Sequence, residues 1–274
     1  MLSAFERLDL LVPLIAGHLV ADFVFQTNRM ATHKDRWGVL LGHISVIAIA
    51  SWVLVGHVVG AIPLILLVSL LHLLIDLGKT AVERWAFGDE RRDAPDLAAS
   101  GFWSQNGRLV LFLGDQGLHV LSLIAAVAVI DGVPFLALPA PDTGIWTAAF
   151  GASYLRLLVL ISGWIVATTA AGYFFAYFLA RFETELEPDQ RGGLEKGGYW
   201  IGVTERSVIY LFILIGEPAG IGFLAAAKSV FRIGELKDSK DRKLAEYILI
   251  GTLVSFAAAM VVGLATRAAL SAMR

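Results

Sequence analysis

The stretch His72-Leu-Leu-Ile-Asp76 decides the fold, because it lies inside an apolar run at residues 62–86. An apolar run of about 20 residues can cross a hydrocarbon core about 30 Å thick. Residues four positions apart share one face of a helix, so His72 and Asp76 would point to the same place. An ionisable side chain inside a membrane helix is costly, about 2.5–3.5 kcal/mol for Asp, and commonly marks a functional site. The stretch therefore predicts a membrane helix that carries a polar pair.

The composition extends this prediction to the whole chain. The 274 residues are 57% hydrophobic and 17% charged, whereas a soluble domain has about 25% charged residues. Because lipid offers no partner to unpaired backbone groups, the spans must be helical. The absence of cysteine excludes disulfides and thiolate metal sites. We expect an all-α, polytopic transmembrane helical bundle, and the net charge of −2 gives no indication of a nucleic-acid partner.

The hydrophobic pattern predicts about eight membrane helices. Their expected ranges are 8–31, 38–60, 62–86, 107–130, 145–181, 199–216, 217–232 and 243–268. Lys and Arg occur in the loops after the first, third, fifth and seventh expected helices. They are absent from the loops after the second and fourth expected helices. Basic loops usually face the cytoplasm, so both termini are expected outside it. We also expect two parts, a four-helix domain at 1–131 with the polar site, and C-terminal helices at 132–274 that act as scaffold or partner surface.

Polar residues recur at helical spacing in the first four expected helices. They read His18-Leu-Val-Ala-Asp22, His43, His72-Leu-Leu-Ile-Asp76 and Asp115-Gln-Gly-Leu-His119. With a rise of about 1.5 Å per residue, all seven side chains fall at one depth in the cytoplasmic half of the membrane. Agreement in depth between four separate helices predicts that the seven side chains converge on one pocket.

Neutral imidazole and carboxylate groups are ligands for Zn²⁺, Mn²⁺ and Fe²⁺. We therefore predict a divalent metal site, with Zn²⁺ as the first choice, formed by His18, Asp22, His43, His72, Asp76, Asp115 and His119. Such a metal turns water into a nucleophile near neutral pH. An Asp outside the metal's ligands would be the catalytic base, and Asp22 and Asp76 are the candidates. A proton or ion relay and a structural polar cluster are the alternatives.

Other polar residues are candidates for substrate contacts. Gln26 and Gln116 would donate hydrogen bonds to a substrate or to a metal ligand. Lys79 either extends its amine to the cytoplasmic interface or holds a phosphate or lipid headgroup. Lys228 precedes a basic loop that either fixes topology or contacts a headgroup. Glu205 and Arg206 lie in a similar position near the beginning of the helix expected at 199–216.

These motifs resemble the domain-of-unknown-function family 3307, a bacterial inner-membrane family. The matching pieces are His18-Leu-Val-Ala-Asp22-Phe-Val-Phe-Gln26, Leu-Gly-His43, His72-Leu-Leu-Ile-Asp76 and Asp115-Gln-Gly-Leu-His119. The resemblance covers about the first 125 residues and implies an inner-membrane location. Residues 221–229 and 234–243 resemble an extension of longer members. More distantly, the His/Asp helices look like membrane-bound proteins labelled metal-dependent hydrolases, although the N-terminal Trp and additional His ligands of soluble members have no counterpart here.

We therefore expect a membrane-embedded metal-dependent hydrolase that acts on a phosphoester or lipid-linked substrate from the inner leaflet, with membrane lipid as its surroundings. The first alternative is a proton- or ion-coupled transporter that uses the same His/Asp cluster as a relay. The second alternative is a structural or regulatory membrane protein.

Overall fold

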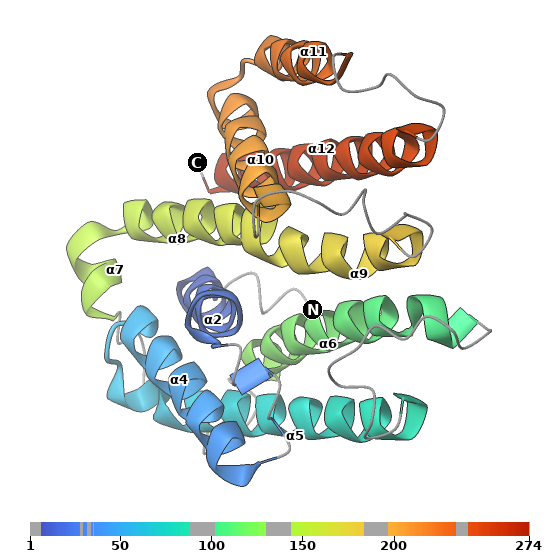
Figure 1. Ribbon diagram of the computed structural model, residues 1–274. Coiled ribbons are helices and arrows are strands. Elements are labelled where there is room, and N and C mark those ends of the chain that lie inside the picture. Colours follow the sequence, from blue (N-terminus) through green and yellow to red (C-terminus); the bar gives the residue numbers. More distant parts are fainter. Residues whose placement is uncertain are drawn as a thin grey trace. The chain divides into compact units, whose positions relative to one another are not determined.

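The computed structural model describes residues 7–27, 30–31, 34, 36–87, 102–129, 144–183, 197–233 and 241–273. Every regular element within these ranges is a helix (Figure 1). Seven helical segments are long and apolar enough to cross a membrane. They are Leu8–Phe25, Trp37–Val55, Val59–Phe87, Asn106–Val129, Ala152–Phe182, Gly197–Ile215 and Lys243–Ala272. The expected all-α, polytopic helical fold is confirmed.

The seventh helix of the sequence prediction, expected at 217–232, is present as α11 (Ala219–Ile233). It has 15 residues, fewer than the roughly 20 that a straight membrane crossing needs. Pro218 directly precedes it, at a position where the missing N–H of proline costs little. Whether α11 crosses the membrane therefore stays a prediction.

The chain divides into two compact units, residues 1–94 with 110–162 and residues 95–109 with 163–272. The first unit contains α2 (Leu8–Val20), α4 (Trp37–Val55) and α5 (Ile62–Phe87), together with most of α6 (Phe102–Val129). The proposed division of roles between residues 1–131 and 132–274 stays a prediction.

Apolar side chains fill one half of the first unit. Its core cluster is formed by Leu10, Leu11 and Leu14 of α2, Val55 of α4, Val58 and Ala61 of the connection, Leu64, Ile65 and Val68 of α5, and Leu123, Ala126 and Val127 of α6. These residues come from the N-terminal part of α2 and α5 and the C-terminal part of α4 and α6. Because neighbouring helices alternate in direction, the opposite half of the same helices remains for the His and Asp residues.

Small residues bring α2 and α4 close together beside this core. A Cβ atom on Gly17 would lie 3.2 Å from the backbone of Ser51, so a larger residue at this position would push the helices apart. Helix α4 ends at Gly56, whose φ of 89° places it in the left-handed region that closes many helices. The chain then returns to α5 through a short 3₁₀ turn, Val59–Ala61. These two features fix the spacing of α2, α4 and α5.

Three expected helices differ from those observed. The first was expected to reach residue 31, but it ends after a π turn at Ala21–Phe25, where Gln26 adopts an extended conformation. The second, expected at 38–60, ends at Val55 because Gly56 takes the left-handed cap. The segment 145–181, expected to be one helix, is interrupted at Gly151, whose φ is 55°. The short α7 (Ile145–Phe150) precedes this break, and the long helical segment begins at Ala152.

The second unit is built from the later helices. They are α9 (Ala171–Glu183) with the π turn Val166–Ala170 before it, α10 (Gly197–Ile215), α11 and α12 (Asp241–Ala272). Helix α8 (Ala152–Ile165) reaches from the first unit into this one. The apolar core of the second unit consists of Ile209, Ile213, Ile221, Phe256 and Ala259. Helix α10 packs mainly against α12.

Candidate metal centre

The structure brings all seven predicted His and Asp side chains together within the first unit. His18 lies on α2 and Asp22 on the π turn that follows it, while His43 lies on α4. Helix α5 carries His72 and Asp76, and α6 carries Asp115 and His119. None of the seven is more than 6% exposed. Four helices thus contribute to one buried polar cluster, hereafter the His/Asp cluster.

The centre of the cluster is formed by His43, His72, Asp22 and Asp76. The Nε2 atoms of His43 and His72 are 3.2 Å apart. Asp22 Oδ1 lies 3.3 Å from His43 Nε2 and 3.5 Å from His72 Nε2. Asp76 Oδ2 lies 3.7 Å from each of these two nitrogens. Two ligand atoms bound at 2.0–2.1 Å to one tetrahedral ion are about 3.3 Å apart, so these separations fit a shared ion.

His119 and His18 form the other side of the cluster. The rings of His72 and His119 have centroids 3.9 Å apart, and those of His18 and His119 are 5.0 Å apart. His119 Nδ1 lies 2.9 Å from the carbonyl oxygen of Asp115. Because a carbonyl oxygen can only accept, Nδ1 carries the proton and Nε2 keeps its lone pair for a ligand. The helix backbone thus presets the tautomer that a metal needs.

Several ligand-type atoms of the cluster are buried without a hydrogen-bond partner. They are both ring nitrogens of His18, Oδ1 of Asp22, Nδ1 of His43, Oδ2 of Asp76, Oδ1 of Asp115 and Nε2 of His119. Such atoms are rare in folded proteins and call for a specific explanation. Three overlapping groups have ligand atoms within 4.8 Å of one another: His18, Asp22 and His72; His43, His72 and Asp76; and Asp76, Asp115 and His119. These residues could hold a divalent metal ion.

Two lysines pair with the cluster. Lys79 Nζ donates to Asp115 Oδ2 at 3.0 Å, so this predicted substrate contact lies against a predicted metal ligand. Lys34 Nζ donates to Asp76 Oδ1 at 2.7 Å. Sequence analysis missed Lys34 because it lies in a connection, where no helical spacing links it to Asp76. In both pairs the lysine holds one carboxylate oxygen and leaves the other facing the imidazoles.

Both predicted glutamines also contact the cluster. Gln26 Nε2 lies 3.4 Å from His43 Nε2, and Gln116 Nε2 lies 3.2 Å from Asp115 Oδ2 and 3.5 Å from Asp22 Oδ2. Gln26 reaches His43 from the extended residue directly after the π turn. Their side-chain amides are therefore placed to orient metal-ligand side chains.

Lys228, predicted as a substrate contact, does not join this cluster, and neither do Ser45 and His57. Lys228 belongs to the second unit, where its Nζ donates to Glu205 at 2.6 Å. Ser45, near His43 in sequence, is exposed and donates to the carbonyl oxygen of Leu41. His57 lies in the turn after α4, where its ring contacts Trp52. Three parts of the sequence lie outside the described residues: His33, the basic connection after the third expected helix (88–101), and residues 234–240.

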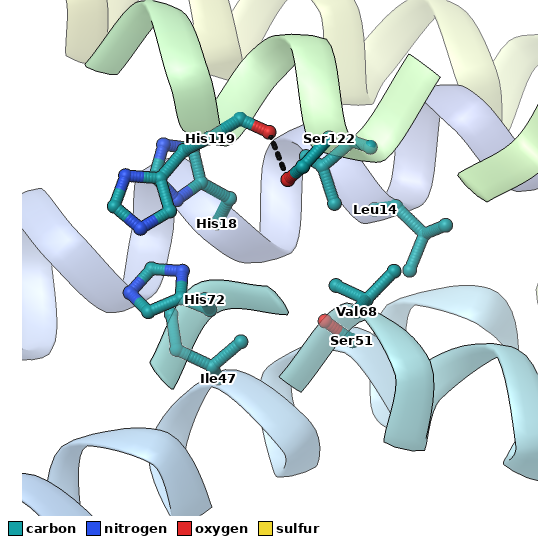
Figure 2. Close-up of a pocket in the computed structure, with 9 residues that line it drawn as sticks. Leu14, His18, Ile47, Ser51, Val68, His72, His119 and Ser122 are labelled. Carbon is teal, nitrogen blue, oxygen red and sulfur yellow. Dashed lines mark hydrogen bonds between the residues drawn. The ribbon is translucent and has the colours of Figure 1, made fainter. Parts of the chain in front are cut away.

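A narrow pocket continues from the imidazoles into the apolar core of the first unit. Its lining is Leu14, His18, Ile47, Ser51, Val68, His72, His119, Ser122 and Leu123. Figure 2 shows the rings of His18, His72 and His119 on one side of the pocket and Leu14 and Val68 on the other. The Ser122 hydroxyl is held by the carbonyl oxygen of His119 at 2.8 Å. The imidazoles therefore border an apolar space.

Residues 10–137 match the family described as "Protein of unknown function (DUF3307)". All seven residues of the His/Asp cluster lie inside the matched region, and the resemblance expected for the N-terminal part of the chain is confirmed. No curated protein and no solved structure matches the chain. The distant likeness to metal-dependent hydrolases stays a prediction.

Proposed function

We propose that this chain, which matches that family over residues 10–137, is a membrane-embedded metal-dependent hydrolase acting on a phosphoester or lipid-linked substrate. The observation that carries the proposal is the convergence of seven buried ligand-type side chains from four helices, with unpartnered atoms at metal-ligand separations. Zn²⁺ is the favoured ion because His and carboxylate ligands suit it. Mn²⁺ and Fe²⁺ are the alternatives.

The charges around the cluster support an anionic substrate. With neutral imidazoles, the carboxylates of Asp22, Asp76 and Asp115 and the ammonium groups of Lys34 and Lys79 add up to a formal charge of −1. One divalent ion would change this charge to +1. A buried charge in a membrane protein needs a partner, and a phosphate oxyanion supplies it.

A divalent ion held by this cluster would supply Lewis-acid chemistry, which would activate water near neutral pH and neutralise charge on a phosphoryl oxygen. The water oxygen forms a bond to phosphorus, and the bond from phosphorus to the leaving oxygen breaks. A carboxylate accepts the proton of the water and passes it to the leaving oxygen. We assign this role to Asp22, because Asp76 already has one oxygen held by Lys34.

The side chains at the edge of the cluster would bind the substrate. Lys34 is 10% and Lys79 is 23% exposed, whereas the carboxylates that they contact are almost fully buried. An ammonium group has three donors, so Lys34 can keep Asp76 and still bind a phosphate oxygen.

A proton relay is the second candidate, and one contact favours it. The Nε2 atoms of His43 and His72 are within 3.2 Å, a distance at which two imidazoles can share a proton. Gln26 extends this contact from the end of the first helix. A relay of this kind would serve a proton- or ion-coupled transporter, and it would require no bound transition metal.

Metal analysis separates these two functions. The full chain, purified in detergent without chelator, is expected to carry about one equivalent of Zn²⁺, Mn²⁺ or Fe²⁺, and added metal should raise its melting temperature. The variant Ser45→Ala is the matched control, because Ser45 lies on the same helix as His43 but is exposed. Hydrolysis is then measured on a chromogenic phosphodiester and on phosphatidylglycerol. Protein that contains almost no transition metal and gains no stability from added ions would refute the hydrolase and favour the relay.

We also propose a bacterial inner-membrane location with both termini outside the cytoplasm. The support is the placement of basic residues in alternate connections of the sequence. This orientation requires that α11 crosses the membrane in addition to the seven longer segments. The lysines of the His/Asp cluster would then face the inner leaflet, from which a lipid-linked substrate enters.

A further inference from the structure

The second unit contains a buried positive charge at the middle of a membrane helix. Arg206 lies nine residues from either end of α10 (Gly197–Ile215) and is only 4% exposed. The sequence suggested that Arg206 lies near the start of its helix, but α10 begins two residues before the expected range and surrounds Arg206 on both sides. Arginine at the centre of a membrane helix is costly, and such residues usually face a partner or a ligand.

The contacts of Arg206 are all to neutral groups. Its Nη1 donates to Ser255 Oγ at 3.3 Å, and its Nη2 donates to the carbonyl oxygen of Thr168 at 3.0 Å. The guanidinium carbon lies 5.3 Å from the ring centroid of Phe175, a cation–π contact. The Nε–H is buried without a hydrogen-bond partner. These contacts hold the guanidinium in place without neutralising it.

The neighbouring carboxylate, Glu205, makes its ion pair with another residue. Glu205 is paired with Lys228 at 2.6 Å, so that pair is neutral by itself. Among the described residues, no carboxylate lies within ion-pair distance of Arg206. The first unit differs, since the partly buried Lys34 and Lys79 are each paired with an Asp. Arg206 therefore retains a full positive charge and at least one unused donor.

Glycines lie on two sides of the guanidinium. A Cβ atom on Gly202, one turn earlier on α10, would lie 2.7 Å from Arg206 Nη1. A Cβ atom on Gly172 of α9 would lie 3.6 Å from Nη2 and 3.4 Å from the Tyr199 ring. A larger residue at Gly202 would therefore crowd the guanidinium, whereas one at Gly172 would be in ordinary contact with it. Gly202 thus lets the guanidinium lie directly against the backbone of α10.

We propose that Arg206 is the receptor for an oxyanion, a carboxylate or a phosphate, within the second unit. The planar guanidinium matches the two oxygens of such a group better than any other side chain. The hydroxyl of Ser255 would provide a further donor beside it. The oxyanion is either a free anion or the acidic group of a lipid, and both would be bound by the same donors. This proposal is independent of the proposed hydrolase, because every residue in it belongs to the second unit.

The test measures anion-dependent stability of the full chain. Melting temperatures are recorded in neutral detergent with increasing sodium phosphate or sodium acetate, with chloride added to hold the ionic strength constant. A second arm uses nanodiscs of phosphatidylcholine with or without phosphatidylglycerol. A saturable rise with phosphate or acetate identifies a free anion, and a rise with phosphatidylglycerol alone identifies a lipid.

Two variants and one control connect the response to Arg206. Arg206→Gln removes the charge, and Gly202→Ala keeps it but fills the space beside Nη1 while favouring the helix. Each should weaken the apparent affinity about tenfold or more, the usual range for losing a hydrogen bond to a charged group. Arg267→Gln removes the charge of an exposed arginine that also bonds a carbonyl oxygen, and it should leave the response unchanged. If Arg206→Gln does not fold, Gly202→Ala alone decides. An equal response in wild type and the folded variants, or no response in either medium, overturns the proposal.

Discussion

Replacing Asp76 with Asn tests the metal centre at its most connected residue. Asp76 is fully buried and belongs to two of the three candidate ligand groups. Changes beside metal ligands typically weaken metal binding 10–100-fold, so we expect at least about 100-fold for a ligand itself. At a free metal concentration of 100 times the wild-type Kd, the metal stabilises wild type by about 2.7 kcal/mol. After a 100-fold loss this contribution falls to about 0.4 kcal/mol, which corresponds to a smaller metal-induced rise in melting temperature by roughly 5–9 °C.

The ion pair with Lys34 has to be separated from this effect. Asp76→Asn leaves the amine of Lys34 without its carboxylate, and breaking a buried pair on one side typically costs about 3–5 kcal/mol. Because the Lys34 side chain is 10% exposed, the loss should lie at or below the lower end of that range. The double variant Asp76→Asn with Lys34→Met removes both charges and should recover part of the stability measured with chelator. It should not recover the response to metal.

The assay is a thermal unfolding series of the full chain in detergent, with chelator and with added Zn²⁺, Mn²⁺ or Fe²⁺. Lys34→Met alone is the matched control, since it removes the same ion pair but keeps every candidate ligand. We expect this control to keep most of its metal response. If the metal-induced rise is the same in wild type and in Asp76→Asn, Asp76 is not a ligand and the reasoning fails.

Three further predictions concern the same site and the topology. The metal-induced rise in melting temperature should shrink as the pH is lowered, because protons compete with the metal for imidazole nitrogens; a rise that is constant between about pH 8 and pH 5.5 would contradict imidazole ligation. Lys79→Met should leave metal content near one equivalent but weaken inhibition by inorganic phosphate about tenfold, the loss typical of one charged hydrogen bond; unchanged inhibition would remove Lys79 from the substrate contacts. A reporter fused after Arg274 should be active only outside the cytoplasm, and cytoplasmic activity would mean that α11 does not cross the membrane.

The spacing of polar residues predicted much of the candidate site. His72 and Asp76, four positions apart, do share one face of α5, and Asp115 and His119 do so on α6. The expected depth in the membrane then predicted that these pairs lie near His18 and His43, which are on other helices. The periodicity of one helix says nothing about the position of residues on another helix. The structure brings these residues together as that argument required. Their role as metal ligands depends on chemistry that spacing alone does not test.

Other features depend on local backbone geometry that the hydrophobic pattern does not contain. Lys34 reaches Asp76 from a connection, and its position follows from the path of the chain after Gln26. The breaks at Gly56 and Gly151 arise from positive φ angles, which a run of apolar residues does not reveal. Arg206 lies at the middle of α10 (Gly197–Ile215), whereas the helix range expected from the sequence placed it nearer the beginning of its helix. Sequence patterns thus predicted helix faces well, and helix ends and connections poorly.

Both buried polar sites lie next to a π turn. Ala21–Phe25 contains Asp22, and Val166–Ala170 contains Thr168, whose carbonyl oxygen accepts from Arg206. A π turn inserts one extra residue into a helix, so the residues after it face a different direction than a regular α-helix would give them. His18 and Asp22 are 3.8 Å apart across the start of the first π turn, longer than a hydrogen bond. The wider turn thus lets Asp22 contact His43 and His72 on other helices instead of closing onto His18, and this places its carboxylate beside the two imidazoles, as the proposed base requires.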